Sequence, residues 1–427
     1  MFRKLGRGRY RCLYASSSSA VGFINGAGGV QSAGAIPPTI GDFSRMEKQK
    51  LLFTPGPLNT SEPVKRAMLR DLGSRDSEFL EVVRKIRQRL LELGEGAGGD
   101  YAAVLMQGSG TFAIESVISS VMPRDGKLLV LINGAYGHRM ARIAQTLGIA
   151  TETLVFPEFL PVDRIAVSRT LTRERAITHV GLVHCETTTG ILNPLVEIGG
   201  AVKQHGRVFL VDAMSSFGGM PISLAACGID FLVSSANKCI QGVPGFGFAL
   251  ARRDLLIAAE GRARSLSLDL VAQWKGLESD GQFRFTPPTH VLLAFWQALE
   301  DLEAEGGIAA RAARYAANQK ALMTGMTALG FDAYLEPAHQ SSIITSFHYP
   351  THPNFEFPRF YQYLSEQGLV IYPGKVSDAN CFRIGTIGQL FPDDIQSLVA
   401  AIRRTLEVMK IDSPRAGRAE AATIGGA

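Results

Sequence analysis

The sequence has few cysteines and no long hydrophobic stretch. No apolar run approaches the roughly 18 residues that a membrane-spanning helix needs, so we expect no membrane partner. Five cysteines lie far apart in 427 residues, and an odd, scattered count is typical of reduced thiols in a cytoplasmic protein. No cysteine pair has zinc-ligand spacing, and the eight histidines do not gather near the cysteines, so no metal site is predicted.

The excess of basic charge is confined to one end of the chain. The formal net charge is +5, but six basic residues and one acidic residue fall within residues 1–45. The remainder therefore carries equal numbers of basic and acidic residues. Because this neutral body offers no polyanion-binding face, we expect no nucleic-acid partner.

The two ends of the chain differ in composition from the body. Residues 1–45 are rich in Arg, Ser and Gly, a pattern shared by organelle transit peptides and by disordered extensions. A third interpretation is a misassigned start, because Met46 opens a sensible N-terminus. We favour a disordered extension or a misassigned start, and we also predict disorder for residues 412–427.

Between these ends, short β-rich runs alternate with helical stretches. Apolar runs separated by helices indicate a mostly parallel sheet that is covered on both faces, and hence an α/β protein. The expected strands are Ala103–Met106, Leu128–Ile132, Val180–His184, Val208–Asp212, Phe231–Ser234 and Phe246–Leu250. The expected helices include Glu78–Leu93, Thr111–Val121, Gly137–Leu147 and Leu195–His205.

A second set of elements follows a long helical region that begins near Thr289. Its expected members are strands over Ile343–Phe347, Val370–Tyr372 and Phe382–Ile384, and helices over Phe357–Gln367 and after Pro392. We therefore expect a large domain over residues 65–300 and a smaller α+β domain over 301–411. Residues 46–64 are expected to form an N-terminal segment that packs with the small domain.

Lys238 lies in the string Ser234–Lys238, just past an expected apolar strand and before a glycine-rich turn. Open α/β sheets bind ligands at the carboxyl ends of their strands. Burial there disfavours the ammonium form, so the amine can be neutral and nucleophilic. A lone lysine in a loop is more often simply solvated, so this position needs further support.

Asp212 supplies that support, because it ends the preceding apolar strand, Val208–Asp212. The strand order places it at the same edge of the sheet as Lys238. A buried carboxylate there can pair with a pyridinium nitrogen and keep the ring protonated, so that the ring withdraws electrons. Considered alone, Asp212 is better explained as a turn residue or a helix cap, so it is the ordered pair of Asp212 and Lys238 that favours a cofactor site.

The string Gly108–Thr111 follows another expected strand and precedes a helix. Backbone N–H groups at a helix N-terminus, together with the hydroxyls of Ser109 and Thr111, form an anion site that suits a phosphate. A short Gly-Ser-Gly string is usually only a turn, so its position beside the expected sheet edge is what favours binding.

Several long strings in the body of the chain match one known family. They are LLFTPGPLNTSEPVK, LMQGSGTFAIES, INGAYG, HCETTTGILNP, VDAMSSFGG, SSANKCIQGVPGFGF, RSLSLDL, FTPPTH, GLVIYPGKVS and FRIGTIG, between about Leu51 and about Met409. Together they resemble the class V group of fold-type I aminotransferases, which depend on pyridoxal 5′-phosphate (PLP). The resemblance implies a mostly parallel seven-stranded sheet in a large domain, with a smaller α+β C-terminal domain.

The resemblance also implies roles for single residues. Lys238 is expected to hold PLP as a Schiff base, and Asp212 to pair with the pyridine nitrogen. The phosphate is expected at Ser109, Gly110 and Thr111. The residues expected to complete the site are Tyr136 stacked on the ring, Thr187 at the phenolic oxygen, Arg383 at the anionic group of the substrate, and Thr286 and Thr289 reaching the phosphate from the other subunit of a homodimer.

The strings match in particular those members that transfer the amino group of 2-aminoethylphosphonate to pyruvate, giving phosphonoacetaldehyde and L-alanine in phosphonate degradation. Related alternatives are an alanine/serine–glyoxylate aminotransferase and an ammonia-lyase of hydroxylated aminophosphonates. A cysteine desulfurase would need a cysteine on a mobile loop, whereas Cys381 lies on an expected strand. A binding module without activity would be expected to have lost Lys238 or Asp212.

Overall fold

The structure is a computed structural model that describes residues 49–414. The extension predicted over residues 1–45 lies outside the described residues, as does all but the first three residues of the tail predicted over 412–427. Among the described residues, no helix combines the length and the hydrophobicity that crossing a membrane requires.

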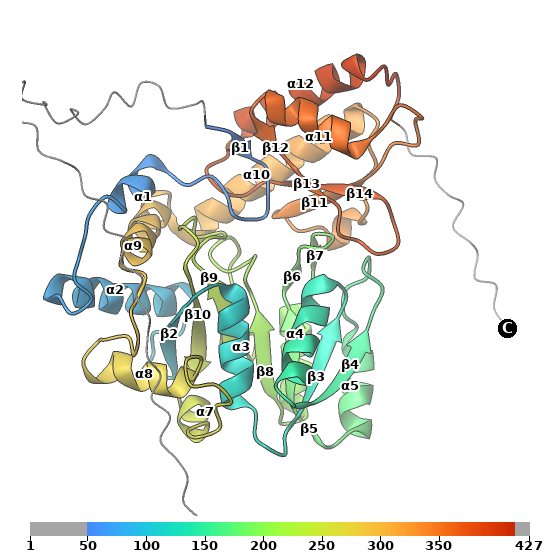
Figure 1. Ribbon diagram of the computed structural model, residues 1–427. Helices are drawn as coiled ribbons and strands as arrows, with labels where there is room; N and C mark the ends of the chain where they lie inside the picture. Colours follow the sequence, from blue (N-terminus) through green and yellow to red (C-terminus); the bar gives the residue numbers. More distant parts are fainter. Residues whose placement is uncertain (1–48, 415–427) are drawn as a thin grey trace, which may run out of the picture. The chain divides into compact units, whose positions relative to one another are not determined.

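A seven-stranded sheet forms the core, in the order β2-β10-β9-β8-β5-β3-β4 (Figure 1). The pairs β9–β8, β8–β5, β5–β3 and β3–β4 are parallel, and only β10 runs antiparallel to its neighbours. The predicted α/β fold with a mostly parallel sheet is therefore confirmed. The strands are β2 (Tyr101–Gln107), β3 (Lys127–Ile132), β4 (Ala150–Val155), β5 (Ile177–Val183), β8 (Val208–Asp212), β9 (Phe231–Ser235) and β10 (Phe246–Arg252).

Helices pack on this sheet through apolar stripes. In α2 (Ser77–Leu93), the fully buried residues are Phe79, Val83, Ile86 and Leu90, which share one helical face. Figure 1 shows α3 (Gly110–Val121) and α4 (Ala135–Thr146) in front of the sheet. The other helices of this part are α1 (Glu62–Ala67), α5 (Arg164–Arg173), α6 (Leu195–Gln204), α7 (Arg253–Ala258) and α8 (Leu270–Ser279), and a small hairpin is made by β6 (Cys185–Glu186) and β7 (Ile191–Leu192).

Strand β4 is absent from the prediction. It is the last strand in the sheet order, and each of its residues is exposed or half-buried. Its sequence, ATETLV, contains no continuous apolar run because only one of its edges is paired. Apolar runs therefore mark the central strands of the sheet but not this edge strand.

A second hydrophobic cluster lies among the C-terminal elements. It surrounds a three-stranded sheet in the order β11-β14-β13, while β1 (Leu51–Leu52) pairs in parallel with β12 (Leu369–Val370). The remaining elements are α9 (Thr289–Ala304), α10 (Gly307–Ala328), the 3₁₀ helix η2 (Pro337–His339), β11 (Ile344–His348), α11 (Phe357–Glu366), β13 (Tyr372–Pro373), β14 (Cys381–Gly385) and α12 (Pro392–Val408). The domain boundaries at residues 64, 300 and 411 stay a prediction.

The single strand predicted over Val370–Tyr372 is wrong. Val370 belongs to β12 and pairs with β1, whereas Tyr372 begins β13 and pairs with β14. Ile371, between them, is fully buried. The short apolar run is therefore shared between two sheets, which periodicity over three residues cannot reveal.

Candidate active site

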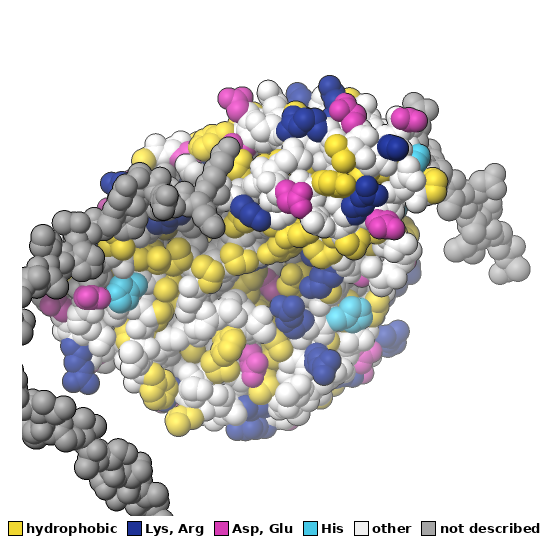
Figure 2. All heavy atoms as spheres, turned by 45° about the horizontal axis from the view of Figure 1, so that its top comes forward, with side chains coloured by type: hydrophobic (Ala, Val, Ile, Leu, Met, Phe, Trp, Pro, Cys, Tyr) yellow, Lys and Arg dark blue, Asp and Glu magenta, His cyan; other side chains and the backbone are white. Residues whose placement is uncertain are grey.

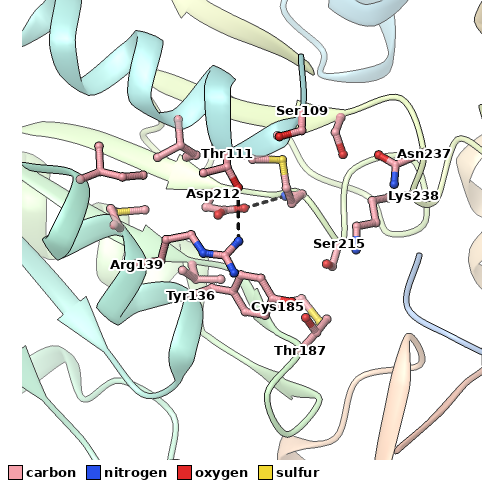
Figure 3. A pocket seen from close by; sticks show the side chains of 17 residues that line it. Ser109, Thr111, Tyr136, Arg139, Cys185, Thr187, Asp212, Ser215, Asn237 and Lys238 are labelled. Carbon is pink, nitrogen blue, oxygen red and sulfur yellow. Dashed lines mark hydrogen bonds between the residues drawn. The ribbon is translucent and has the colours of Figure 1, made fainter. Parts of the chain in front are cut away.

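A cavity of about 190 Å³ opens where β8 and β9 end and where α3 and α4 begin. Figure 3 shows side chains from these elements pointing into it. Seven of the residues predicted from the sequence line it: Ser109, Gly110, Thr111, Tyr136, Thr187, Asp212 and Lys238. The structure therefore brings together residues that are spread over 130 positions of the sequence.

Lys238 follows β9 by three residues and lines the cavity. Its Nζ donates a hydrogen bond of 2.7 Å to the carbonyl oxygen of Pro55. Burial lowers the pKa of this amine, which the nearby Tyr136 and Asp212 only partly offset. The amine is thus shifted toward its neutral form, the form that can attack a carbonyl carbon.

The backbone of the N-terminal segment lies directly against this lysine. Gly56 has a φ of +112°, and a Cβ there would lie 2.7 Å from Cδ of Lys238 and 3.0 Å from the carbonyl oxygen of Asn237. Glycine allows both the positive φ and the close approach. Residues 54–57 therefore form one wall around the lysine.

Asp212 ends β8, beside β9 in the sheet, so it lies at the same edge as Lys238. Its Oδ1 accepts a 2.9 Å hydrogen bond from the backbone N–H of Met214. Burial raises the pKa of the carboxyl group to about 6, although the Met214 bond opposes this rise. A cationic partner in the cavity would stabilise the carboxylate and remove the cost of burying it alone.

The N-terminus of α3 also faces the cavity, as Figure 3 shows for Ser109 and Thr111. Ser109 is the N-cap residue, but its hydroxyl makes no capping hydrogen bond to the helix. The hydroxyl and the first N–H groups of α3 are therefore available to an anion. Arg139 of α4 adds a positive charge here, and its Nη1 donates a 3.2 Å hydrogen bond to Oγ1 of Thr111.

Tyr136 lies on the other side of the cavity, at the start of α4. Glu186 fixes this helix end, because its buried carboxylate accepts hydrogen bonds from the N–H groups of Tyr136 (3.0 Å) and Gly137 (3.2 Å). Burial opposes ionisation of the Tyr136 hydroxyl, but the charge of Lys238 and the nearby polar side chain of Thr187 lower its pKa overall. The ring is thus held beside Thr187, as Figure 3 also shows.

Arg383 lies on β14 and is 6% exposed. It stands behind the cavity lining, where its Nη1 donates to the carbonyl oxygen of Thr187 (2.7 Å) and its Nε to that of Pro373 (3.0 Å). Both acceptors are neutral, and among residues 49–414 no carboxylate oxygen lies within 4.0 Å of this guanidinium. A buried guanidinium without a carboxylate partner favours an anionic ligand.

Besides Arg383, which lies behind the lining, Thr286 and Thr289 are predicted site residues that do not line the cavity. Thr286 is exposed, and Thr289 begins α9. Their expected role is in the site of a second subunit, so it stays a prediction.

The cavity lining also contains residues that were not predicted from the sequence, among them Arg139, Ser215 and Asn237. Asn237 precedes Lys238 directly, and Arg139 follows Tyr136 by three residues on one helix, so spacing from the predicted residues is a usable signal for these two. Within the described residues, no three His, Cys, Asp or Glu side chains gather as metal ligands.

Comparison with known proteins decides the family. A profile of the family described as "Aminotransferase class-V" matches residues 61–383. The chain belongs to the class-V aminotransferase family. The membership that the sequence strings indicated is therefore confirmed.

This aminotransferase has similar relatives in several bacteria. The 2-aminoethylphosphonate–pyruvate transaminase of Syntrophobacter fumaroxidans is 56% identical over 358 residues, which cover 84% of this chain and 96% of the relative. The protein of the same name from Vibrio cholerae is 53% identical over 363 residues, covering 84% and 99%.

Solved structures show the same fold. The pyridoxamine–pyruvate aminotransferase of Mesorhizobium loti has a TM-score of 0.78 at 25% identity, and the match covers 86% of this chain and 95% of that one. The alanine–glyoxylate aminotransferase of Nostoc sp. has a TM-score of 0.77 at 24% identity, covering 86% and 100%. The fold-type I architecture is thereby established for this aminotransferase.

The cofactor of this aminotransferase is PLP, as its family membership shows. The cavity fits that molecule in three respects. The uncapped hydroxyl of Ser109 lies at a helix N-terminus, where a phosphate binds. Asp212 offers a buried carboxylate that gains from a cationic ring, and Lys238 offers an amine shifted toward its neutral form.

Proposed function

We propose that this aminotransferase transfers the amino group of 2-aminoethylphosphonate to pyruvate, giving phosphonoacetaldehyde and L-alanine. The supporting observation is the similarity to two relatives that are named for this activity. They are 56% and 53% identical to this chain over alignments that cover 84% of it. The site agrees with two anionic substrates, because Arg383 is a buried guanidinium that no described carboxylate neutralises.

Lys238 is proposed as the residue that binds the cofactor and then moves the proton. When bound, PLP supplies a carbonyl carbon for the amine and an electron-withdrawing ring. Once a substrate amine has taken its place, the Lys238 amine is free to remove a proton from the carbon beside the substrate nitrogen. Its lowered pKa suits this role, since a protonated amine cannot act as a base.

The other residues hold the reacting groups in place. Asp212 is proposed to bind the ring nitrogen and keep it protonated. Tyr136 is proposed to cover one face of the ring, and Thr187 to bind its phenolic oxygen. Ser109, Gly110 and Thr111 are proposed to hold the phosphate, whose negative charge the N-terminus of α3 favours.

Arg383 is proposed to hold the anionic end of each substrate in turn. A planar guanidinium can donate two parallel hydrogen bonds to a carboxylate or a phosphonate. Its bonds to Pro373 and Thr187 fix the orientation of the guanidinium before a substrate arrives.

We also propose that the enzyme is a cytoplasmic homodimer in which Thr286 and Thr289 of each subunit reach the phosphate site of the other. Large apolar side chains near both segments are exposed: Phe112 (52%), beside the phosphate site, and Phe285 (46%), next to Thr286. Figure 2 shows a band of hydrophobic side chains across the middle of the face drawn, which is a feature expected of an interface between subunits.

A panel of amino donors with pyruvate held constant tests the proposed reaction. The panel contains 2-aminoethylphosphonate, its 1-hydroxy form, taurine, β-alanine and serine. We expect L-alanine to form fastest from 2-aminoethylphosphonate. Transfer with glyoxylate and alanine only, or ammonia release without pyruvate, would contradict the proposal.

A further inference from the structure

Lys375 follows β13 by two residues, in the loop that joins β13 to β14. Its Nζ lies over the ring of Tyr136, 4.1 Å from the ring centroid. Arg383, on β14, interacts electrostatically with the same tyrosine. One hairpin thus brings two cations to a single aromatic ring in the active site.

The hairpin is built to hold Lys375 in this place. Arg383 pairs with Tyr372 across the two strands, and its Nε donates to the carbonyl oxygen of Pro373. At Gly374, a Cβ would lie 2.1 Å from the carbonyl oxygen of Cys381, so only glycine lets the turn lie so close to β14. The residue that follows this close contact is Lys375.

The far side of the same loop is fixed to two other segments. The N–H of Ser377 donates a 2.9 Å hydrogen bond to Oε2 of Glu158, which lies in the segment after β4. The hydroxyl of Tyr334 donates a 2.8 Å bond to Oδ1 of Asp378. The position of Lys375 is therefore set by contacts at both ends of the loop.

Lys375 forms no ion pair in the described part of the chain. Within residues 49–414, no carboxylate oxygen lies within 4.0 Å of Lys375 or of Arg383. A third cation at the same ring, Arg139, lies 4.8 Å from the centroid but is engaged with the hydroxyl of Thr111 at the phosphate site. Arg139 thus belongs to the phosphate site, and Lys375 and Arg383 are the two cations of this hairpin that a substrate anion could meet.

We propose that Lys375 is a specificity-determining residue that binds the phosphonate group of the amino donor and contributes little to binding a carboxylate. A carboxylate has two oxygens, which the fork of Arg383 can satisfy alone. A phosphonate has a third oxygen and carries a second negative charge at mildly alkaline pH. The ammonium group of Lys375 binds this third oxygen and balances the second charge. The inference rests on the proposed function, since it explains how one site accepts both substrates.

The test compares two ligands that lack the amino group: ethylphosphonate and its carboxylate counterpart, propionate. Their binding to the PLP-loaded enzyme is measured by calorimetry at mildly alkaline pH, for the wild type, Lys375→Met and Lys375→Arg. Loss of a hydrogen bond between charged groups predicts about 10- to 100-fold weaker ethylphosphonate binding by Lys375→Met. Propionate binding should change less than about threefold, and Lys375→Arg should retain most of the ethylphosphonate affinity.

A matched control is Lys85→Met, because Lys85 also lies over an aromatic ring, that of Trp296 at 5.7 Å, but on the surface helix α2. This variant should bind both ligands like the wild type. Unchanged ethylphosphonate binding by Lys375→Met overturns the inference, and so does an equal loss for both ligands. Turnover of 2-aminoethylphosphonate by the wild type is measured separately. If there is no turnover, the proposed function is rejected, and the binding comparison still decides the role of Lys375.

Discussion

The amine of Lys238 donates a hydrogen bond to the carbonyl oxygen of Pro55, which lies 183 residues earlier in the chain. Thr54 stabilises this turn, because its hydroxyl donates to the carbonyl oxygen of Pro57 at 2.5 Å. The N-terminal segment therefore shapes the site although it lies outside the central sheet. Any change that moves residues 54–57 should move the lysine with them.

Gly56→Ala tests this relationship. The new Cβ would lie 2.7 Å from Cδ of Lys238, and alanine would be strained at a φ of +112°. We expect a loss of about 1–3 kcal/mol in the free energy of unfolding and a fall of about 100-fold in kcat, because the lysine is displaced. Urea unfolding and steady-state kinetics measure the two effects.

The control for this substitution is Gly98→Ala, since a Cβ at Gly98 would meet nothing within 4 Å. It should leave stability and turnover close to those of the wild type. A Gly56→Ala enzyme with the kcat of the wild type would show that the wall around Lys238 does not position it.

Asp212→Asn should stabilise the protein from which the cofactor has been removed. Burial raises the pKa of Asp212 to about 6, against about 3.9 for an unfolded chain. The unfolded state therefore ionises first, and stability falls as pH rises between these values. The asparagine variant does not suffer this loss of stability. Its free energy of unfolding should therefore exceed that of the wild type by about 3 kcal/mol at pH 7 and by roughly half that at pH 5.

Urea unfolding of both cofactor-free proteins at the two pH values measures the difference. With PLP bound, the same variant should lose most of its turnover, because asparagine cannot keep the ring nitrogen protonated. Equal free energies of unfolding for the two cofactor-free proteins at pH 7 would show that burying the Asp212 carboxylate costs no stability.

Tyr315→Phe tests the support behind Lys238. The buried Tyr315 hydroxyl accepts a hydrogen bond from Gln241 (2.7 Å) and donates one to the carbonyl oxygen of Cys239 (3.2 Å), the residue after Lys238. We expect a loss of about 1–2 kcal/mol in the free energy of unfolding. Turnover should also fall, because the turn that carries the lysine is less firmly held.

Tyr101→Phe is the matched control, since the buried Tyr101 hydroxyl donates a comparable bond to the carbonyl oxygen of Ile229, two residues before β9. Its stability should fall by a similar amount with turnover unchanged. If both variants lose the same fraction of kcat, the hydrogen bonds of Tyr315 stabilise the protein but do not position Lys238.

The sequence predicts the central part of the fold because both faces of these strands are buried. The strand that ends at Asp212 begins with four apolar residues and the strand that precedes Lys238 with three, and β8 has the predicted bounds. Two such strands in succession also place their carboxyl ends at one edge of the sheet, so the pairing of Asp212 with Lys238 follows from the order of the strands along the chain.

Contacts between distant segments could not be predicted in this way. The approach of Pro55 to Lys238 depends on how the N-terminal segment packs beside the large sheet, and that of Lys375 to Tyr136 on how the C-terminal elements do. No local pattern of residues encodes either packing. Strand β4 was missed for a different reason, since a half-exposed edge strand has no apolar run.

The most direct test of the central assignment is the Lys238→Ala enzyme, compared with the wild type and with Lys275→Ala, which removes an exposed lysine. After loading with PLP, the wild type and the control should show the visible absorption of a lysine-linked cofactor and should form L-alanine from 2-aminoethylphosphonate and pyruvate. Lys238→Ala should lack that absorption, and its turnover should be at least about 1,000-fold lower. Transamination by Lys238→Ala at the rate of the wild type would contradict the assignment.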